Sequence, residues 1–137
     1  MSTSLQRKAE KLAQLLERLK AEAAKNALIV VEGQNDIEAL TELSIQGNII
    51  SVKTAGKSFL DILTEIEGHN TSETILLLDF DRRGKEWTKR LKQRLEEKRI
   101  KANINFWNRL HALVGRHIKD IEGLPAYMKT LKKRIGN

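Results

Sequence analysis

An amphipathic pattern opens the chain. Between residues 4 and 25, leucines recur at spacings of three, four and seven residues among Lys, Arg, Glu and Ala, which places them on one face of a helix. Residues 2–4 supply Ser and Thr side chains that can cap its N-terminus. The apolar stripe can pack on the chain's own sheet, which we favour, or against another chain. Its leucines are Leu5, Leu12, Leu15, Leu16 and Leu19.

Short apolar segments alternate with helical patterns in the rest of the chain. Two of them, ALIVV and TILLL, are unbroken apolar runs, typical of strands that are buried on both faces of a parallel sheet. The alternation predicts one compact α/β domain with a parallel sheet of about four strands, flanked by helices. We predict strands at 27–33, 48–56, 74–81 and 101–107, and helices at 35–47, 57–68, 85–98, 107–116 and 124–134.

The composition restricts the kind of protein that the chain can be. A length of 137 residues suits a single domain, and no apolar run approaches the ~20 residues of a membrane-spanning helix. The first residues lack the apolar core of a signal peptide, so we expect a cytoplasmic location and no membrane partner. The chain has no cysteine, and its three histidines are not at common ligand spacings. Any metal ion must therefore be bound by oxygen atoms.

The positive charge is concentrated in one segment. The chain carries a formal net charge of +7, and residues 82–101 alone hold ten Lys or Arg against three acids. Such a basic surface is typical of a protein that binds a polyanion, nucleic acid before membrane when no lipid-facing stripe accompanies it. A well-solvated helix face is the structural alternative.

Carboxylates follow two of the predicted strands. Glu32 ends the first strand, and Asp79 and Asp81 end the third. The carboxyl ends of parallel strands form the usual ligand site of such a sheet, and residues two apart in an extended segment face the same way. Converging carboxylates repel each other unless a hard cation such as Mg²⁺ or Mn²⁺ lies between them. The alternative for an aspartate after a strand is to cap the next helix.

Lys57 and Tyr127 are further candidates with structural alternatives. Lys57 starts a predicted helix, where it can contact a phosphate or face solvent. The surrounding segment TAGKSFL is not a nucleotide-binding P-loop, because Ser51 stands where that motif requires its first glycine. Tyr127 is the only tyrosine, and its apolar neighbours favour packing over a role as nucleophile.

Two segments carry a resemblance to a known family. VVEGQNDIEAL at 30–40, followed by ILLLDFDRRG at 75–84, resembles the Toprim domain of topoisomerases, bacterial-type primases, OLD-family nucleases and nucleases that mature ribosomal RNA. The resemblance covers about residues 26–120 and is closest to small stand-alone Toprim proteins of archaea and bacteria; IKDIEGLP at 118–125 also resembles the segment that closes them. We therefore expect the amphipathic N-terminal helix at 1–25 to be followed by a Toprim domain at 26–137. No zinc-binding region or separate tyrosine-bearing domain accompanies it, which argues against a complete primase or topoisomerase.

The resemblance implies a Mg²⁺- or Mn²⁺-dependent reaction on nucleic acid. It makes Glu32 a general acid or base and places Glu32, Asp79 and Asp81 at the metal ion, with Asp36 of the first motif as a further candidate. The function expected first is a nuclease that acts on RNA before DNA. The alternatives are a non-catalytic RNA-binding module and a subunit of an RNA-processing complex, with a protein partner or a second copy bound through the N-terminal helix. The residues expected to bind nucleic acid are Lys57, Arg82, Arg83, Lys85 and Lys89.

Overall fold

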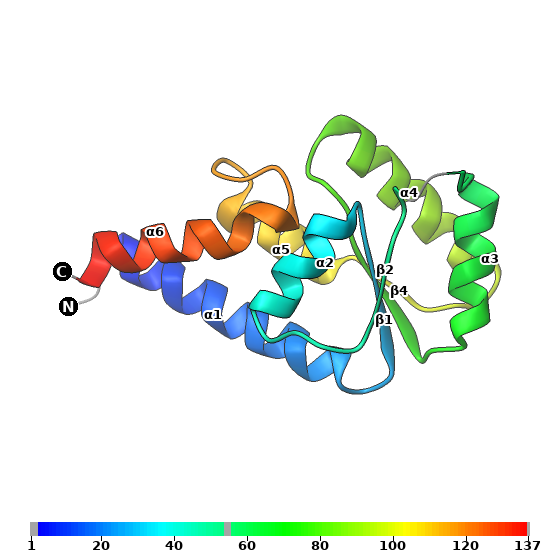
Figure 1. Cartoon of the computed structure of the whole chain (residues 1–137), viewed down its shortest axis with the longest axis horizontal. Helices are drawn as coiled ribbons and strands as arrows, with labels where there is room; N and C mark the ends of the chain where they lie inside the picture. The colour runs from blue at the N-terminus through cyan, green and yellow to red at the C-terminus, as the bar shows by residue number, and fades with distance from the viewer. Residues whose placement is uncertain (1–2, 54–55, 137) are drawn as a thin grey trace.

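A parallel sheet forms the centre of the molecule (Figure 1). The computed structural model describes residues 3–53 and 56–136, and the strand order within them is β2-β1-β3-β4, with every neighbouring pair parallel. The strands are β1 Ala27–Val31, β2 Asn48–Ser51, β3 Glu73–Leu77 and β4 Ala102–Asn103. The helices are α1 Ser4–Ala23, α2 Gln34–Glu42, α3 Phe59–His69, α4 Arg82–Glu97, α5 Asn105–Val114, the 3₁₀ helix η1 Ile121–Gly123 and α6 Leu124–Gly136.

Helices cover both faces of the sheet (Figure 1). Successive residues of β1 point to opposite faces: Ile29 and Val31 pack with α1, α2, α5 and α6, whereas Leu28 and Val30 pack with α3 and α4. Because both faces are buried, β1 is apolar throughout, and β3 is apolar from Ile75 onward after the buried Glu73 and Thr74. The predicted α/β fold with a four-stranded parallel sheet is confirmed. Within the described ranges, no helix combines the length and apolarity needed to cross a bilayer.

The apolar stripe of α1 packs within the chain. It joins residues of α5 and α6 in one buried core, and α1 and α6 lie side by side (Figure 1). Thr3 caps α1, since its hydroxyl oxygen accepts the Gln6 amide hydrogen at an N···O distance of 3.1 Å. Ser2, another predicted cap, lies outside the described residues. A contact with a partner or a second copy through α1 stays a prediction. The buried leucines are Leu12, Leu15, Leu16 and Leu19.

Two predicted elements are wrong in their second halves. The strand predicted at 101–107 ends at Asn103, because the Asn103 side chain accepts the amide hydrogen of Asn105 at 2.8 Å and turns the chain into α5. The helix predicted at 35–47 ends at Glu42, and Ser44 follows with a left-handed φ of 64°. In both segments apolar residues continue the hydrophobic pattern beyond the end of the element, so the pattern overestimates its length.

The strands that lead to the candidate site are also shorter than predicted. β1 ends at Val31 and β3 at Leu77, so the carboxylates that follow lie in the loops rather than in the strands. β2 ends at Ser51, and residues 54–55 of the predicted second strand lie outside the described residues. The next helices begin where a side chain caps them. Ser58 caps α3, and Asp81 caps α4, which begins at Arg82, three residues before its predicted start.

Candidate functional site

The carboxyl ends of β1 and β3 border a polar cavity of about 290 Å³. The parallel register sets Val31 beside Leu77, so the first residues after these strands emerge next to each other. The N-terminus of α2 and the 3₁₀ helix η1 complete the walls. The charged residues that line the cavity are Glu32, Lys53, Asp36, Asp79, Asp120 and Glu122.

Glu32 is fixed in the cavity by the segments that follow both neighbouring strands. Its side chain is buried, with 5% exposure for the residue, directly after β1. Its Oε2 accepts the backbone N–H of Asp79 at 3.3 Å, and its Oε1 lies 3.9 Å from the Lys53 ammonium nitrogen. Glu32 is therefore an acidic group with a defined position and restricted access to water.

Asp36 connects α2 to η1. Its Oδ2 accepts the Gly33 amide hydrogen at 2.9 Å, and its Oδ1 accepts that of Glu122 at 2.8 Å. Burial raises the pKa of the Asp36 carboxyl, and the hydrogen bonds from these two amides oppose the rise. The resemblance indicates Asp36 as a candidate, because it matches an acid of the first motif. Its contact with η1, eighty-six residues away, requires the tertiary structure.

Asp79 is the most perturbed acid of the cavity. Burial raises its pKa to about 7, and the negative charges of Glu32 and Asp36 add to the rise. Asp120 acts in the same direction, whereas Lys53 opposes it. Asp79 therefore binds a proton near neutral pH when no cation is present, and the charge of a bound cation would release that proton.

Asp81 caps the next helix, which is the alternative role of an aspartate that follows a strand. It is the N-cap of α4, where its Oδ1 accepts the Gly84 amide hydrogen at 2.7 Å, and it does not line the cavity. Gly84 is required here for a second reason: a Cβ at this position would overlap the carbonyl oxygen of Asp79. The glycine thus lets α4 pack against the loop that carries both aspartates.

Asp120 and Glu122 are site residues that the sequence did not indicate. Together with Asp36 they can each offer one oxygen atom, and these atoms lie within 4.8 Å of one another, a spacing suited to a cation. Asp120 is the N-cap of η1 and Glu122 lies within it, after the two segments that carry the family motifs. The signals in the sequence are two acids two positions apart in IKDIEGLP and the resemblance of this segment to the one that closes small Toprim proteins. No strand end or helical period marks them, so they stand out only once η1 is placed against α2.

The predicted phosphate-binding residues divide into two groups. Lys57 is paired with Glu65 at 2.6 Å, and the exposed Arg82 contacts Glu86 at 3.3 Å. Arg83, Lys85 and Lys89 are exposed on α4, directly after Asp81. The structure also places Lys53, which the sequence analysis did not single out, at the cavity. Tyr127 packs against the core and stacks on the His117 ring, 5.1 Å between centroids.

Known proteins share both the motifs and the architecture. The Toprim domain model matches residues 27–107. A UPF0292 protein of Methanocaldococcus jannaschii is 34% identical over 119 residues, which cover 87% of this chain and 91% of the relative. A UPF0292 protein of Methanosarcina acetivorans is 32% identical, over 93% of this chain and 86% of the relative. A solved structure of an Aquifex aeolicus protein superposes with a TM-score of 0.66 at 33% identity, over 81% of this chain and 95% of that one.

The parallel sheet and the acidic site at its carboxyl end define a Toprim domain, as the motifs predict. The chain belongs to the Toprim family and, within it, groups with the small UPF0292 proteins. Toprim domains bind divalent metal ions through acidic residues, and the set Asp36, Asp120 and Glu122 offers such ligands here. The family thus indicates a metal-dependent function that involves nucleic acid.

Proposed function

We propose that the chain is a Mg²⁺-dependent nuclease that acts on RNA before DNA. The observation that carries the proposal is the position of the acidic cavity, which adjoins the start of the basic helix α4. A site for a cation and side chains that can hold phosphates are therefore neighbours. Mn²⁺, a hard cation of similar ligand preference, is expected to substitute for Mg²⁺.

The acids of the cavity fit a divalent cation. The raised pKa of Asp79 reflects burial and the surrounding negative charge, both of which disfavour the ionised form until a cation is present. Asp79 would hold the ion together with oxygens of Asp36, Asp120 and Glu122, which already lie close together. Asp81 can contribute only the oxygen that does not accept the Gly84 amide. When bound, Mg²⁺ supplies charge neutralisation at the phosphate and polarises its oxygen.

Glu32 is the residue that we propose to move a proton. Its carboxylate is buried in the cavity and positioned by the Asp79 amide, so its distance from a reacting phosphate is set by the sheet. In hydrolysis it would take the proton of the attacking water or give one to the leaving oxygen. Lys53, 3.9 Å from Glu32 and in the lining of the cavity, would contact a phosphate oxygen.

The first turns of α4 carry the side chains that we propose to bind the nucleic acid. Arg83, Lys85 and Lys89 are exposed and form no ion pair with another residue in the described part of the chain. They are free to contact phosphates on the strand that passes the cavity. Arg82 would leave its ion pair with Glu86 to contact a phosphate. The loss of stability would be small, because exposed ion pairs contribute little to the free energy of folding.

The substitution Glu32→Gln tests this proposal. It keeps the size of the side chain and removes its ionisable proton, so Mg²⁺-dependent cleavage should fall by about 10²- to 10⁴-fold. Nucleic-acid affinity should stay equal or become slightly tighter, because a negative charge beside the phosphate is lost. The measurement is single-turnover cleavage of structured RNA, single-stranded RNA and single-stranded DNA, with filter binding in parallel.

Glu10→Gln, the same chemical change on the exposed face of α1, is the matched control and should cleave like the wild type. Full cleavage by Glu32→Gln would remove Glu32 from the mechanism. If the wild type binds these nucleic acids but cleaves none of them with Mg²⁺ or Mn²⁺, the non-catalytic RNA-binding module or subunit becomes the better proposal.

A further inference from the structure

Three arginines and a tryptophan form a stripe along one side of α4. Arg83, Trp87, Arg90 and Arg94 follow one another at spacings of four, three and four residues, which places them on the same face of the helix. The three arginines are exposed, and none forms an ion pair or side-chain hydrogen bond with another described residue. We call this set the arginine stripe. It begins at the end of α4 that adjoins the acidic cavity and runs away from the cavity.

Two aromatic rings lie where the arginine stripe contacts α3. The Phe59 ring, at the start of α3, packs edge-on against the Trp87 ring, with 5.4 Å between the centroids and 76° between the planes. Both side chains are partly exposed, and the Trp87 indole N–H has no hydrogen-bond partner among the described residues. Leu60, the next residue of α3, is 65% exposed and extends the apolar surface. Aromatic rings among basic side chains are typical of surfaces on which nucleic-acid bases stack.

Arg90 connects these rings to a hollow on α4. Its guanidinium carbon lies 4.1 Å from the centroid of the Phe59 ring, a cation–π contact that orders the long side chain. The hollow has a volume of about 350 Å³ and is lined by Phe59, Arg90, Gln93, Arg94 and Glu97. It therefore combines an ordered guanidinium group, on which a base can stack, with a second arginine that can bind a phosphate.

The length of α4 determines which part of a strand reaches the hollow. Arg90 follows the N-cap Asp81 by nine residues, which is about 14 Å at the rise of an α-helix. A strand that passes the acidic cavity and continues along α4 thus brings its bases to the rings a few nucleotides away from the cavity. Paired bases are stacked inside a duplex and cannot reach these side chains, so this part of the strand must be unpaired.

We propose that the arginine stripe and the Phe59–Trp87 pair bind a single-stranded segment of nucleic acid, a few nucleotides from the phosphate at the acidic cavity. Bases stack on the Arg90 guanidinium and the exposed part of Trp87, and phosphates contact Arg83 and Arg94. The proposal rests on the proposed function and specifies its substrate, a strand with an unpaired flank. Arginines without acidic partners favour a polyanion, and a single strand supplies phosphates and planar bases together, which an acidic peptide does not.

Fluorescence titration in EDTA tests the proposal, because EDTA prevents metal-dependent cleavage and leaves binding to be measured. Trp107 is buried and donates to the Leu78 carbonyl, so Trp87 is the tryptophan that a bound base can quench. The probes are a single-stranded RNA of about ten nucleotides, the same RNA paired with its complement, and a strand of equal length and charge without bases. The single-stranded RNA should quench Trp87 and bind about fivefold more tightly, or better, than the strand without bases.

Two substitutions of Trp87 separate stacking from packing. Trp87→Leu removes the aromatic surface and should weaken binding of single-stranded RNA by about fivefold or more, whereas Trp87→Phe should retain most of the affinity. Fluorescence anisotropy of a labelled strand measures both variants. Their melting temperatures are measured first, because Trp87 also packs against the core.

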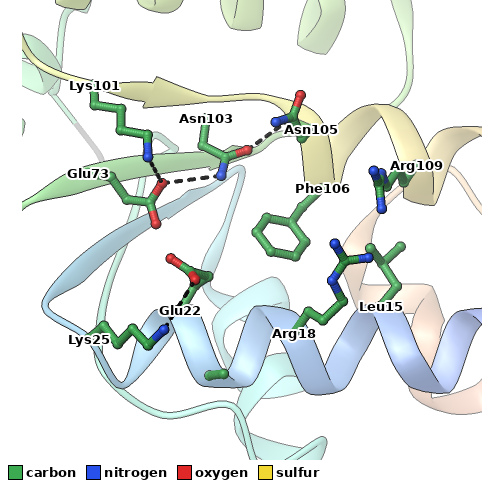
Figure 2. A pocket seen from close by; sticks show the side chains of 11 residues that line it. Leu15, Arg18, Glu22, Lys25, Glu73, Lys101, Asn103, Asn105, Phe106 and Arg109 are labelled. Carbon is green, nitrogen blue, oxygen red and sulfur yellow. Dashed lines mark hydrogen bonds and ion pairs between the residues drawn. The ribbon is translucent and has the colours of Figure 1, made fainter.

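The arginines are tested at exposed positions where folding is not at risk. Arg90→Gln combined with Arg94→Gln should weaken binding by about tenfold and flatten the slope of log K against log salt by about 1. The matched control combines Arg18→Gln with Arg109→Gln, which removes the same charge from exposed, neighbouring side chains on α1 and α5 (Figure 2). These helices pack on the other face of the sheet, so the control should bind like the wild type.

The outcomes separate this proposal from the proposed nuclease. Binding without quenching of Trp87, or equal affinity for the strands with and without bases, would overturn this proposal and leave cleavage at the acidic cavity untouched. A wild type that binds as expected but cleaves nothing with Mg²⁺ would support this surface and overturn the nuclease. A dimer that Leu60→Ser dissociates, with no binding of any strand, would assign the surface to a second copy of the chain and overturn the proposal.

Discussion

At the scale of single residues, Asp79 makes the stability of the folded protein depend on pH. Its pKa rises from 3.8 in the unfolded chain to about 7 in the folded protein, so the folded state retains a proton that the unfolded chain has lost. Stability contributed by this group is therefore present below about pH 4, is lost as pH rises to about 7, and changes no further above that value. A divalent cation removes this loss because it stabilises the ionised carboxylate.

Asp79→Asn should consequently stabilise the metal-free protein in a pH-dependent way. The gain in melting temperature over the wild type should be small near pH 4 and largest at pH 8, in EDTA. Millimolar Mg²⁺ should reverse the order at pH 8, because the amide binds the cation poorly. The same melting-temperature difference at both pH values would show that Asp79 has an ordinary pKa.

Gly84, the last residue of the ILLLDFDRRG segment, has no room for a side chain. A methyl group here would overlap the Asp79 carbonyl oxygen, so Gly84→Ala should destabilise the protein by about 1–3 kcal/mol and weaken cation binding by displacing Asp79. Gly68→Ala is the control, since it lies in α3 with open space around its Cβ position and should be neutral or slightly stabilising. Chemical denaturation of both variants measures the difference. A Gly84→Ala protein as stable as Gly68→Ala would contradict the close approach.

At the scale of elements, α4 is the helix whose charge the proposed function uses. If Arg83, Lys85 and Lys89 each contact a phosphate, their triple alanine variant should flatten the slope of log K against log salt by about 2 on single-stranded RNA. The matched control replaces Lys129, Lys132 and Lys133 of α6, which are also exposed but lie on another helix. It should leave the slope nearly unchanged. Equal flattening by both variants would indicate a diffuse effect of net charge rather than an interface on α4.

At the scale of the whole molecule, the sequence predicts the layers better than the sites. The apolar runs of β1 and β3 identify buried parallel strands, because few other environments require uninterrupted apolar residues. Asp79 and Glu32 are predictable for a related reason: the carboxyl ends of such strands converge. The exact ends of the helices and strands cannot be predicted in this way, because single side chains such as Asn103 determine them.

The remaining site residues depend on long-range packing. Glu122 reaches the cavity through a hydrogen bond between its amide and Asp36, and no local pattern marks the η1 segment as a neighbour of α2. Asp81 illustrates the converse: its spacing from Asp79 predicts a shared direction, but the strand ends at Leu77 and Asp81 turns to cap α4. Sequence spacing indicates a ligand set only while the backbone keeps the conformation that the spacing assumes.

Calorimetric titration of the protein with Mn²⁺ and Mg²⁺ at pH 8 shows whether the acidic cavity binds a divalent cation through Asp79. The wild type should bind, and Asp79→Asn should lose most of the affinity. Glu10→Gln, which removes one carboxylate from the exposed face of α1, should bind like the wild type. Equal affinity of the wild type and Asp79→Asn, or no binding by the wild type, would contradict cation binding through Asp79.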